Sequence, residues 1–468
     1  MATTDTNDTE ASVAQAKRII DAGGELVRFT TQGTREAENM KNISARLKAD
    51  GYPQPLVADV HFTAHTADVA ALYCEKVRIN PGNYVDPGRV FKHLEYTDEE
   101  YAAELQKIER KFVPFLNICK EHHTAIRIGV NHGSLSDRIM SRYGDTPAGI
   151  VESCMEFLRI CRRENFNDVV ISIKASNTVV MVNTVRLLVE TMDKEDMHYP
   201  LHLGVTEAGE GEDGRIKSAV GIGALLTEGI GDTIRVSLSE EPEAEIPIAQ
   251  KLVELIPECT RLREQAEKSL TADLPSGASS SSDEESAYIK ENTLYLTLTA
   301  PDYETFQLKA AMIAGPILID GKATELETHP IPPCLGREFN SAESNLSPLS
   351  SFLSSLSDSI LQAARVKFTK TEYISCPGCG RTLYDLRTTI QRIKEATKDM
   401  KGLKIGIMGC IVNGPGEMAD ADYGYVGAGR GKISLYRQKE CVEKNIPEEE
   451  AVEHLLRLIQ EDTKKGAE

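Results

Sequence analysis

The sequence lacks any apolar run of the ~18 residues that a membrane-spanning helix needs. Its first ten residues, MATTDTNDTE, have neither the basic stretch nor the apolar core of a signal peptide. A membrane-spanning protein and a secreted protein are therefore both disfavoured. We expect a cytoplasmic protein whose 468 residues form two or three domains, and the hydrophobic fraction of 41% is typical of a globular chain.

Positive charge is also scarce. The chain has 53 Lys and Arg against 72 Asp and Glu, which gives a net charge of −19. Nucleic acid and anionic membranes are therefore disfavoured as general partners, although a small basic pocket is still allowed. The ten cysteines of such a chain are expected to be mostly reduced, so a group of them indicates a metal site rather than disulfides.

Complete nucleotide-binding motifs are absent, although glycine-rich stretches are present. GYVGAGRGK (424–432) has Val426 where the P-loop requires glycine, and Ile433 follows its lysine. GIGALL, which begins at Gly221, has Leu226 where the dinucleotide fingerprint requires glycine. Because no nicotinamide or flavin site is visible, the electrons for any redox reaction must come from outside the chain.

What is present is a repeated alternation of strand-like and helix-like segments. The strand-like runs are LVRFT (26–30), LVADVHF (56–62), KVRIN (76–80), AIRIGVN (125–131), DVVISIKAS (168–176), LHLGVTEAG (201–209) and DTIRVSLS (232–239). Helical patterns separate them, as in EASVAQAKRIIDAGG, whose apolar residues fall on one face. These repeated units predict an α/β fold, a TIM-type (β/α)8 barrel over residues 1–260.

A closed barrel of this type needs eight strands, and only seven are visible. The chain opens on MATTDT, which is typical of the loop that follows a first strand. We therefore expect Met1 to be an internal methionine of a longer reading frame that supplies the first strand. The chain as given is then predicted to be aggregation-prone or weakly active, because the gap leaves two unpaired sheet edges.

The composition changes after residue 260. SLTADLPSGASSSSDEES (269–286) is an acidic, serine-rich linker, and SAESNLSPLSSFLSSLSDS (341–359) is a second low-complexity tract. We expect residues 261–365 to form a linker and a small inserted α/β domain that is partly disordered. Residues 366–468 are predicted to form a compact C-terminal α/β domain that carries a cysteine motif.

Basic residues recur on the predicted strands. Three strands share an apolar–Arg–apolar–polar pattern with Arg28, Arg78 and Arg127, and two later strands add Lys174 and Arg235. The carboxyl ends of barrel strands line the mouth where active sites lie. One such arginine alone is more often a structural salt bridge. Five desolvated cations need an anion, and arginine suits phosphate oxygens, so the mouth is predicted to bind a phosphorylated substrate.

Carboxylates end strands at the same level as these cations. A carboxylate among several cations is the best candidate for proton transfer. Two of them compete for this role, Asp59 in LVADVHF and Glu207 in VTEAG, and we favour Glu207.

The C-terminal region contains a cysteine constellation. SCPGCGR supplies Cys376 and Cys379, and GCIVNGPGE adds Cys410 and Glu417. A structural zinc site would need a second C-x2-C or H-x3-H, which does not follow, and a dithiol redox pair fits the third cysteine less well. Three thiolates fit an iron–sulfur cluster whose unusual fourth ligand is Glu417. A carboxylate binds such iron more weakly than a thiolate, so Glu417 can yield its place to substrate.

These motifs resemble those of the 4-hydroxy-3-methylbut-2-enyl diphosphate synthases of the non-mevalonate isoprenoid pathway. SCPGCGRT and GCIVNGPGE are similar to the two cluster motifs of that family, and RINPGN, RIGVNHGSL, TEAG and RVSLS to its barrel motifs. The resemblance covers residues 3–257 and 366 to the C-terminus. It implies an oxidoreductase that opens the ring of 2-C-methyl-D-erythritol 2,4-cyclodiphosphate with two electrons from reduced ferredoxin or flavodoxin.

The resemblance also implies roles for single residues. A 4Fe–4S cluster would be held by Cys376, Cys379, Cys410 and Glu417, and the catalytic residues would be Glu207 and Glu417. The diphosphate would be bound by Arg28, Arg78, Arg127, Asn131, Lys174, Arg235 and Ser237. Some members of the family carry a large insert and close the site within one chain, whereas members without it close the site across a homodimer. Residues 261–365 are similar to a shortened insert, so both a monomer and a homodimer are expected alternatives.

Two other interpretations stay open at this stage. One is a truncated copy of the enzyme with low activity. The other is a non-catalytic phosphate-binding barrel whose C-terminal domain is stabilised by zinc. Metal content and colour distinguish this second alternative from an iron–sulfur enzyme.

Overall fold

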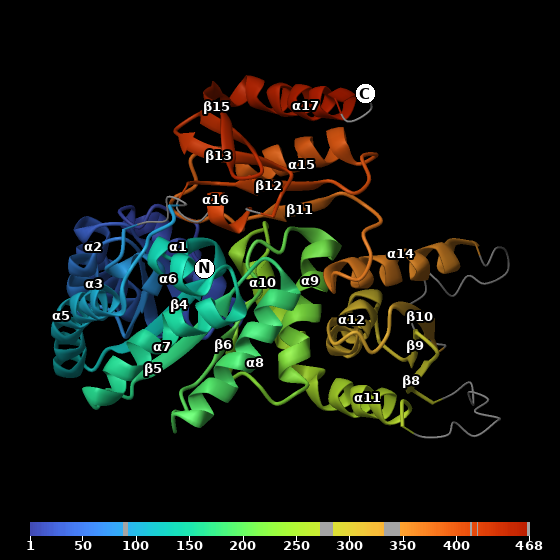
Figure 1. The fold of residues 1–468 in the computed structure, drawn as a ribbon, viewed down its shortest axis with the longest axis horizontal. Helices are drawn as coiled ribbons and strands as arrows, with labels where there is room; N and C mark the ends of the chain where they lie inside the picture. The colour runs from blue at the N-terminus through green and yellow to red at the C-terminus, as the bar shows by residue number, and fades with distance from the viewer. Residues whose placement is uncertain (88–91, 272–283, 332–346, 412–413, 419, 466–468) are drawn as a thin grey trace.

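The computed structural model describes residues 1–87, 92–271, 284–331, 347–411, 414–418 and 420–465. Figure 1 shows three groups of elements that follow one another along the chain. The first group, blue to yellow-green, ends with α11. A small group with α12 and α14 lies beside it, and the last group, orange-red to red, lies over it. None of the described helices is long and apolar enough to cross a membrane.

The first group is built on seven strands. Strands β1 to β5 pair in sequence order, β6 pairs with β7, and a bridge between Ile171 and Leu201 joins β5 to the second pair. The strands are β1 Val27–Thr31, β2 Leu56–Val60, β3 Lys76–Ile79, β4 Ala125–Asn131, β5 Val169–Lys174, β6 His202–Leu203 and β7 Thr233–Ile234. All seven predicted strands are confirmed. Because every pairing is parallel, their carboxyl ends lie on the same side of the barrel.

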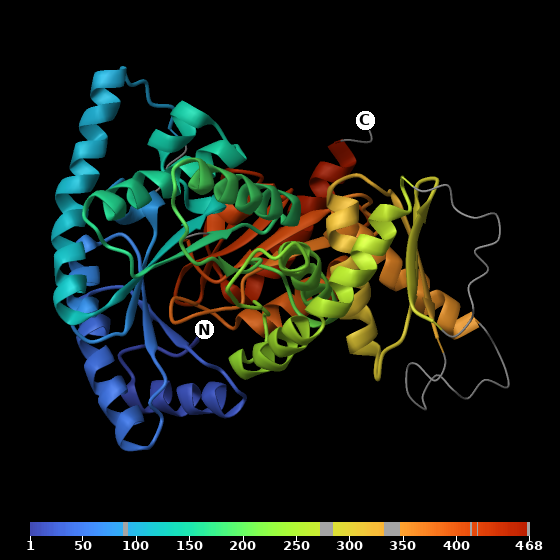
Figure 2. The same cartoon turned by 90° about the horizontal axis from the view of Figure 1, so that it is seen from below.

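Helices follow the strands and lie on their outer face (Figure 2). The helices are α1 Thr9–Asp21, α2 Thr34–Ala49, α3 Ala64–Ala71, α4 Pro81–Tyr84, α5 Asp98–His122, α6 Asp137–Tyr143, α7 Pro147–Arg163, α8 Thr178–Lys194, α9 Gly211–Leu226, α10 Glu245–Glu254 and α11 Ile256–Lys268, with short 3-10 turns at His132–Ser134 and Pro242–Ala244. The apolar face predicted for the first helix is buried in α1. The Asp8 side chain begins this helix by accepting a hydrogen bond from the Ala11 backbone N–H.

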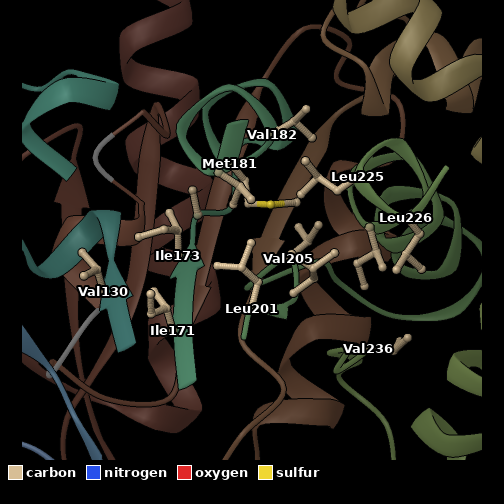
Figure 3. Packing of buried hydrophobic residues seen from close by; sticks show 14 of the residues in the cluster. Val130, Ile171, Ile173, Met181, Val182, Leu201, Val205, Leu225, Leu226 and Val236 are labelled. Carbon is tan, nitrogen blue, oxygen red and sulfur yellow. The ribbon is translucent and has the colours of Figure 1, made fainter. Parts of the chain in front are cut away.

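The core of the first group lies between the strands and these helices. Figure 3 shows Met181 of α8 between Ile173 of β5 and Leu225 of α9, with Ile171 further along β5. Both isoleucines and Met181 are at most 2% exposed. Burying each such side chain contributes about 1.5–3 kcal/mol, so this packing holds the strands in place beneath the site.

An opening in the strand order lies beside the N-terminus. No ladder joins β7 to β1 within the described ranges. The Ala2 backbone N–H donates to the Arg28 carbonyl at 2.8 Å, and the Met1 amino group lies 3.7 Å from the Glu245 carboxylate. The first two residues therefore lie between β1 and the segment that follows β7. The strand expected before Met1 stays a prediction.

The middle group packs directly on the barrel helices. Its elements are β8 Ser286–Lys290, β9 Thr293–Leu298, α12 Tyr303–Ile319, β10 Glu325–Pro330 and α14 Ser347–Ala363, with the strand order β10-β9-β8. Helix α12 crosses α9 at glycine positions. A Cβ on Gly315 would lie 2.7 Å from the Val220 carbonyl oxygen, so only glycine lets the two backbones approach this closely.

The second serine-rich tract is more ordered than we expected. Residues 347–359 of the tract lie in α14, whereas 341–346, like residues 272–283 of the first tract, lie outside the described residues. Leu349, Leu353, Leu356 and Ile360 recur at helical spacing, and the last two are fully buried. This apolar stripe gives the helix a face to bury despite its serine content.

The last group is a mixed five-stranded sheet covered by helices. Its elements are β11 Glu372–Ser375, α15 Leu386–Thr397, β12 Lys404–Met408, α16 Gly414–Glu417, β13 Tyr423–Gly429, β14 Lys432–Arg437, β15 Glu440–Pro447 and α17 Glu448–Lys465. Strands β11 to β13 are parallel, and β14 and β15 are antiparallel. The parallel edge lies nearest the barrel in Figure 1, which brings the loops after β11 and β12 to the barrel mouth.

Candidate functional site between the barrel and the C-terminal group

One cavity lies between the carboxyl ends of the barrel strands and the loops of the C-terminal group. Every barrel strand, or the segment directly after it, contributes to its wall. The predicted site residues that line it are Arg28, Arg78, Arg127, Asn131, Lys174, Glu207, Arg235, Ser237, Cys376, Cys379 and Cys410. Glu417 reaches the same place through Thr206, another lining residue, whose hydroxyl donates to Glu417 Oε2 at 3.4 Å. The structure thus brings the two sets of predicted residues together.

The cations in this cavity are not equivalent, and Arg78 is fully engaged with the protein. Its Nη1 donates to Asp59 Oδ1 at 2.9 Å and also contacts the His61 ring. Its Nη2 donates to the Gly129 carbonyl at 2.8 Å and to Asn131 Oδ1 at 3.1 Å. Only Nε lacks a partner among the described residues. Arg78 therefore organises the wall of the site and has little capacity left for a ligand.

Arg127 and Lys174 differ from Arg78 in their hydrogen bonding. They are 5% and 3% exposed, and neither side chain donates a hydrogen bond to any residue that the structure describes. Burial, followed by the charges of neighbouring arginines, lowers the pKa of both groups well below the ordinary range. Arg28 and Arg235 each keep a buried Nε without a hydrogen-bond partner in the same described part, and Arg235 Nε lies 3.9 Å from the Glu245 carboxylate. Unpaired buried cations are costly, so this half of the cavity is built for an anion that compensates them.

This difference leads to a prediction for two alanine variants. Arg127→Ala is expected to weaken binding of inorganic pyrophosphate by about 10- to 100-fold, because it removes hydrogen bonds to a charged group. It is expected to leave the ligand-free melting temperature unchanged or higher, since it removes an uncompensated charge. Arg78→Ala is expected to lower that temperature, because it breaks a buried ion pair. Calorimetric titration and thermal melts check both, and equal pyrophosphate affinity in Arg127→Ala and wild type would contradict the assignment.

Two carboxylates lie together at the contact between barrel and C-terminal group. Glu207 and Glu417 are 7% and 3% exposed, and Glu207 has a left-handed backbone with φ of 50°. Burial raises the pKa of Glu207, and burial together with the Glu207 charge raises the pKa of Glu417 well above its usual range. The surroundings of both carboxyls therefore favour their protonated forms. The site holds a buried acid.

The turn that carries Glu417 makes a close backbone contact with the barrel. A Cβ on Gly133 would lie 2.4 Å from the Glu417 backbone nitrogen, and one on Gly416 would lie 1.5 Å from the Gly133 carbonyl oxygen. Ser176 adds a hydrogen bond from its hydroxyl to the Glu417 carbonyl at 3.2 Å. The glycines of GCIVNGPGE thus serve docking as well as the predicted turn. Asn413 of that turn lies outside the described residues.

The cysteines approach the cavity from the C-terminal side. Cys376 Sγ accepts a hydrogen bond from the Gly409 backbone N–H at 3.2 Å, and burial raises the pKa of this thiol to about 12. Ser239 of the barrel donates to the Cys376 carbonyl at 3.0 Å, and a bridge pairs Ala208 with Ser375. The first cysteine is therefore anchored directly to the barrel.

The donor set can be tested against a metal centre. Within the described residues, no three His, Cys, Asp or Glu side chains stand close enough to hold a metal ion in this arrangement. Three thiols nevertheless line one cavity, and Glu417 Oε1 is buried without a partner in that part of the chain. These donors fit an iron–sulfur cluster in chemical type, and binding would require the thiols to lose their protons.

Among the lining residues that sequence reasoning missed, the polar side chains of Thr206 and Arg381 lie beside the predicted ligands. Thr206 directly precedes Glu207 and lies beside both carboxylates, and Arg381 directly follows the glycine of the cysteine motif. The sequence could have indicated them only by their position, because each is adjacent to a motif residue. Neither residue has a strand-end pattern or a metal-ligand spacing that would have singled it out.

Comparison with known proteins decides the family. Residues 1–250 match the family model described as the GcpE TIM-barrel domain, and residues 372–461 match the GcpE protein C-terminal domain. The chain belongs to the GcpE family. The resemblance found in the motifs is thereby confirmed, and so is the TIM-barrel prediction for the N-terminal part of this GcpE chain.

Curated relatives match the GcpE chain over nearly its whole length. A 4-hydroxy-3-methylbut-2-en-1-yl diphosphate synthase (flavodoxin) of Bacteroides fragilis is 53% identical, and the match covers 98% of this chain and 92% of the relative. Proteins of the same name are 53% identical in Phocaeicola vulgatus and 41% identical in Akkermansia muciniphila, where the match covers 98% of this chain and 94% and 92% of the relatives. Among solved structures, a 2,3-dimethylmalate lyase matches 60% of this chain and 83% of its own at 13% identity, with a TM-score of only 0.25.

Proposed function

We propose that this GcpE chain is a 4-hydroxy-3-methylbut-2-enyl diphosphate synthase. In this function it reduces 2-C-methyl-D-erythritol 2,4-cyclodiphosphate with two electrons and opens its ring. One observation carries the proposal: unpaired buried cations, cysteine thiols and a buried acid meet in a single cavity. The names of relatives that are 53% identical over 98% of the chain support it.

The barrel side of the cavity would bind the diphosphate. Buried N–H groups that lack a hydrogen-bond partner in the described part of the chain are supplied by Arg28, Arg127, Lys174 and Arg235. Ser237 accepts from Arg235 Nη2 at 2.8 Å and Asn131 accepts from Arg78, so these two orient the cations. A cyclic diphosphate is small and doubly charged, which suits a compact group of cations better than a long nucleotide would.

The C-terminal side would hold the redox centre. Cys376, Cys379 and Cys410 are the proposed thiolate ligands of a 4Fe–4S cluster, and Glu417 is the proposed fourth ligand. When bound, the cluster supplies the substrate with electrons that arrive from reduced flavodoxin, the donor in the relatives' names, with ferredoxin as the alternative donor. The sequence contains no complete flavin or nicotinamide motif, so the electrons are proposed to come from outside the chain.

The two carboxylates account for the proton that the reaction needs. Ring opening breaks the C2–O bond to phosphate and the C3–O bond, and the C3 oxygen leaves as water only if it receives a proton. Glu207 and Glu417 lie together and are buried, and the pKa of each is raised, which favours the protonated carboxyl. We assign Glu207 as the acid, since Glu417 is also needed as a ligand.

The proposed domains are a barrel of residues 1–260, a shortened insert of residues 261–365 and a cluster domain of residues 366–468. The match to the Bacteroides fragilis relative runs over 587 residues, whereas this chain has 468, which supports an insert shorter than that of the relative. Hydrogen bonds from Ser176, Thr206 and Ser239 reach the C-terminal domain of the same chain. We therefore propose that one chain closes its own site.

Anaerobic purification tests the proposed function. We expect a brown protein with about four irons and matching sulfide per chain. With chemically reduced flavodoxin it should convert the cyclodiphosphate to the ring-opened product, which mass spectrometry detects. A colourless protein with one tightly bound zinc would contradict the proposal and favour the zinc-stabilised barrel. A brown protein without turnover would favour the low-activity copy.

A further inference from the structure

Arg381 of the C-terminal domain lies in the cavity that holds the barrel cations. It lies two residues after Cys379 and is 9% exposed. Its Nη2 donates to Asp59 Oδ2 at 3.4 Å, which joins residues far apart in the sequence. Its Nη1 is buried and has no partner in the part of the chain that the structure describes. Asp59 therefore holds one side of this guanidinium and the Cys379 side chain lies beside it, while Nη1 is the group left for a ligand.

The backbone around Arg381 is built to let it enter the barrel mouth. A Cβ on Gly380 would lie 2.7 Å from the Thr4 carbonyl oxygen and 3.6 Å from Thr30, so any other residue here would push the segment outward. Gln32 donates from Nε2 to the Gly380 carbonyl at 3.5 Å. The close contact and this hydrogen bond set the depth of Arg381 and are independent of its ion pair.

Asp59 is shared between two arginines. Its Oδ1 accepts from Arg78 and its Oδ2 accepts from Arg381, and Asp59 itself is only 2% exposed. Burial opposes its ionisation, but the charges of Arg28 and Arg78 keep the pKa of Asp59 well below its usual range. One negative charge cannot neutralise the cations around it. The cavity keeps an excess of positive charge on the side where Arg381 enters.

We propose that Arg381 is a substrate-binding residue, whose Nη1 binds an anionic oxygen of the cyclodiphosphate, and that Asp59 is the positioning residue that orients it. The inference rests on the proposed function and adds a residue from the second domain to the anion site. The consequence is that the diphosphate contacts both domains at once. Substrate binding then stabilises the docked arrangement, and the anion site is complete only in that arrangement.

The test compares two arginines of the C-terminal domain in the full-length, anaerobically prepared protein. Arg381→Gln removes the charge inside the cavity. Arg387→Gln is the matched control, because Arg387 also pairs with a barrel carboxylate, Glu241, but both side chains are substantially exposed at 39% and 52%. Titration with inorganic pyrophosphate and with the cyclodiphosphate is followed by calorimetry. Iron content is measured in every sample, so that cluster loading is known.

We expect Arg381→Gln to raise the Kd for both probes by about 10- to 100-fold, as for losing a hydrogen bond to a charged group. We expect Arg387→Gln to stay within about threefold of wild type, as for an exposed ion pair. The Michaelis constant for the cyclodiphosphate should rise in Arg381→Gln. Wild-type affinity in Arg381→Gln at normal iron content would overturn the proposal, and so would a changed cluster reduction potential with unchanged affinity.

Two further variants keep the inference testable. If Arg381→Gln does not fold, Arg381→Met removes the charge but keeps an unbranched apolar side chain, and an unchanged Kd in this variant would overturn the proposal. Gly380→Ala should raise the Kd in the same direction by displacing Arg381. The Arg127→Gln variant separates this inference from the proposed function. Weakened binding there but not in Arg381→Gln defeats only the inference, whereas no binding by wild type defeats both.

Discussion

Replacing Cys410 with alanine is expected to remove most of the iron and sulfide from the protein and to abolish turnover. Cys410 lines the cavity together with Cys376 and Cys379. The thiolates of these three cysteines are the proposed cluster ligands. A cluster held by two thiolates and one weakly binding carboxylate lacks one of its four ligands, and one of the three that bind strongly. Iron and sulfide analysis of the anaerobically purified protein should fall from about four per chain to below about one.

Two other cysteines provide the control for this result. Cys441 lies in β15, where its thiol contacts the Glu443 carbonyl, and Cys74 is buried in the barrel. Neither lines the cavity. Cys441→Ala and Cys74→Ala should therefore keep wild-type iron content. Full iron in Cys410→Ala, or equal loss in all three variants, would show that the cysteine motif does not hold the cluster.

Replacing Glu417 with cysteine is expected to separate cluster retention from turnover. A thiolate binds iron more strongly than a carboxylate, so iron content should equal or exceed that of wild type. Turnover should fall by about 100-fold or more, a size typical of losing a group that acts at the reacting centre. The thiolate would not yield its place on the iron to the substrate.

The measurements for this variant are iron content, the absorbance of the cluster and product formation with reduced flavodoxin. Glu450→Cys, an exposed position in the first turn of α17, controls for the addition of a thiol and should behave as wild type. If Glu417→Cys turned over at the wild-type rate, an exchangeable carboxylate would not be needed. Lower iron content than wild type would show that Glu417 is not placed to be a ligand.

Much of the site could be predicted because its residues carry local patterns. Arg28, Arg78 and Arg127 repeat the same position in three of the first four strands, and parallel strands must bring such positions to one end of a barrel. The C-x2-C spacing of Cys376 and Cys379 indicates a pair of metal ligands. The sequence alone shows these patterns, because the period of a strand or a turn already determines which side chains share a face.

The remaining features could not be predicted, because they depend on contacts between distant segments. All five cations lie on predicted barrel strands, yet Arg78 is engaged by Asp59, Gly129 and Asn131, while Lys174 has no hydrogen-bond partner in the described part of the chain. Arg381 has no pattern at all and becomes part of the cavity only because its loop enters the barrel mouth. Helix α14 was obscured for another reason, since its serine content concealed a narrow apolar stripe.

The sequence by itself determined the seven strands, the family and the chemical types of the groups in the site, because periodicity, spacing and side-chain chemistry are properties of short segments. Only the tertiary structure decided which cations are free for an anion, that Glu207 and Glu417 share a buried environment, and that Gly133 and Gly416 let the two domains touch. Burial, pairing and pKa depend on what surrounds a side chain. Those surroundings come from residues hundreds of positions away, which the packing of the domains brings together.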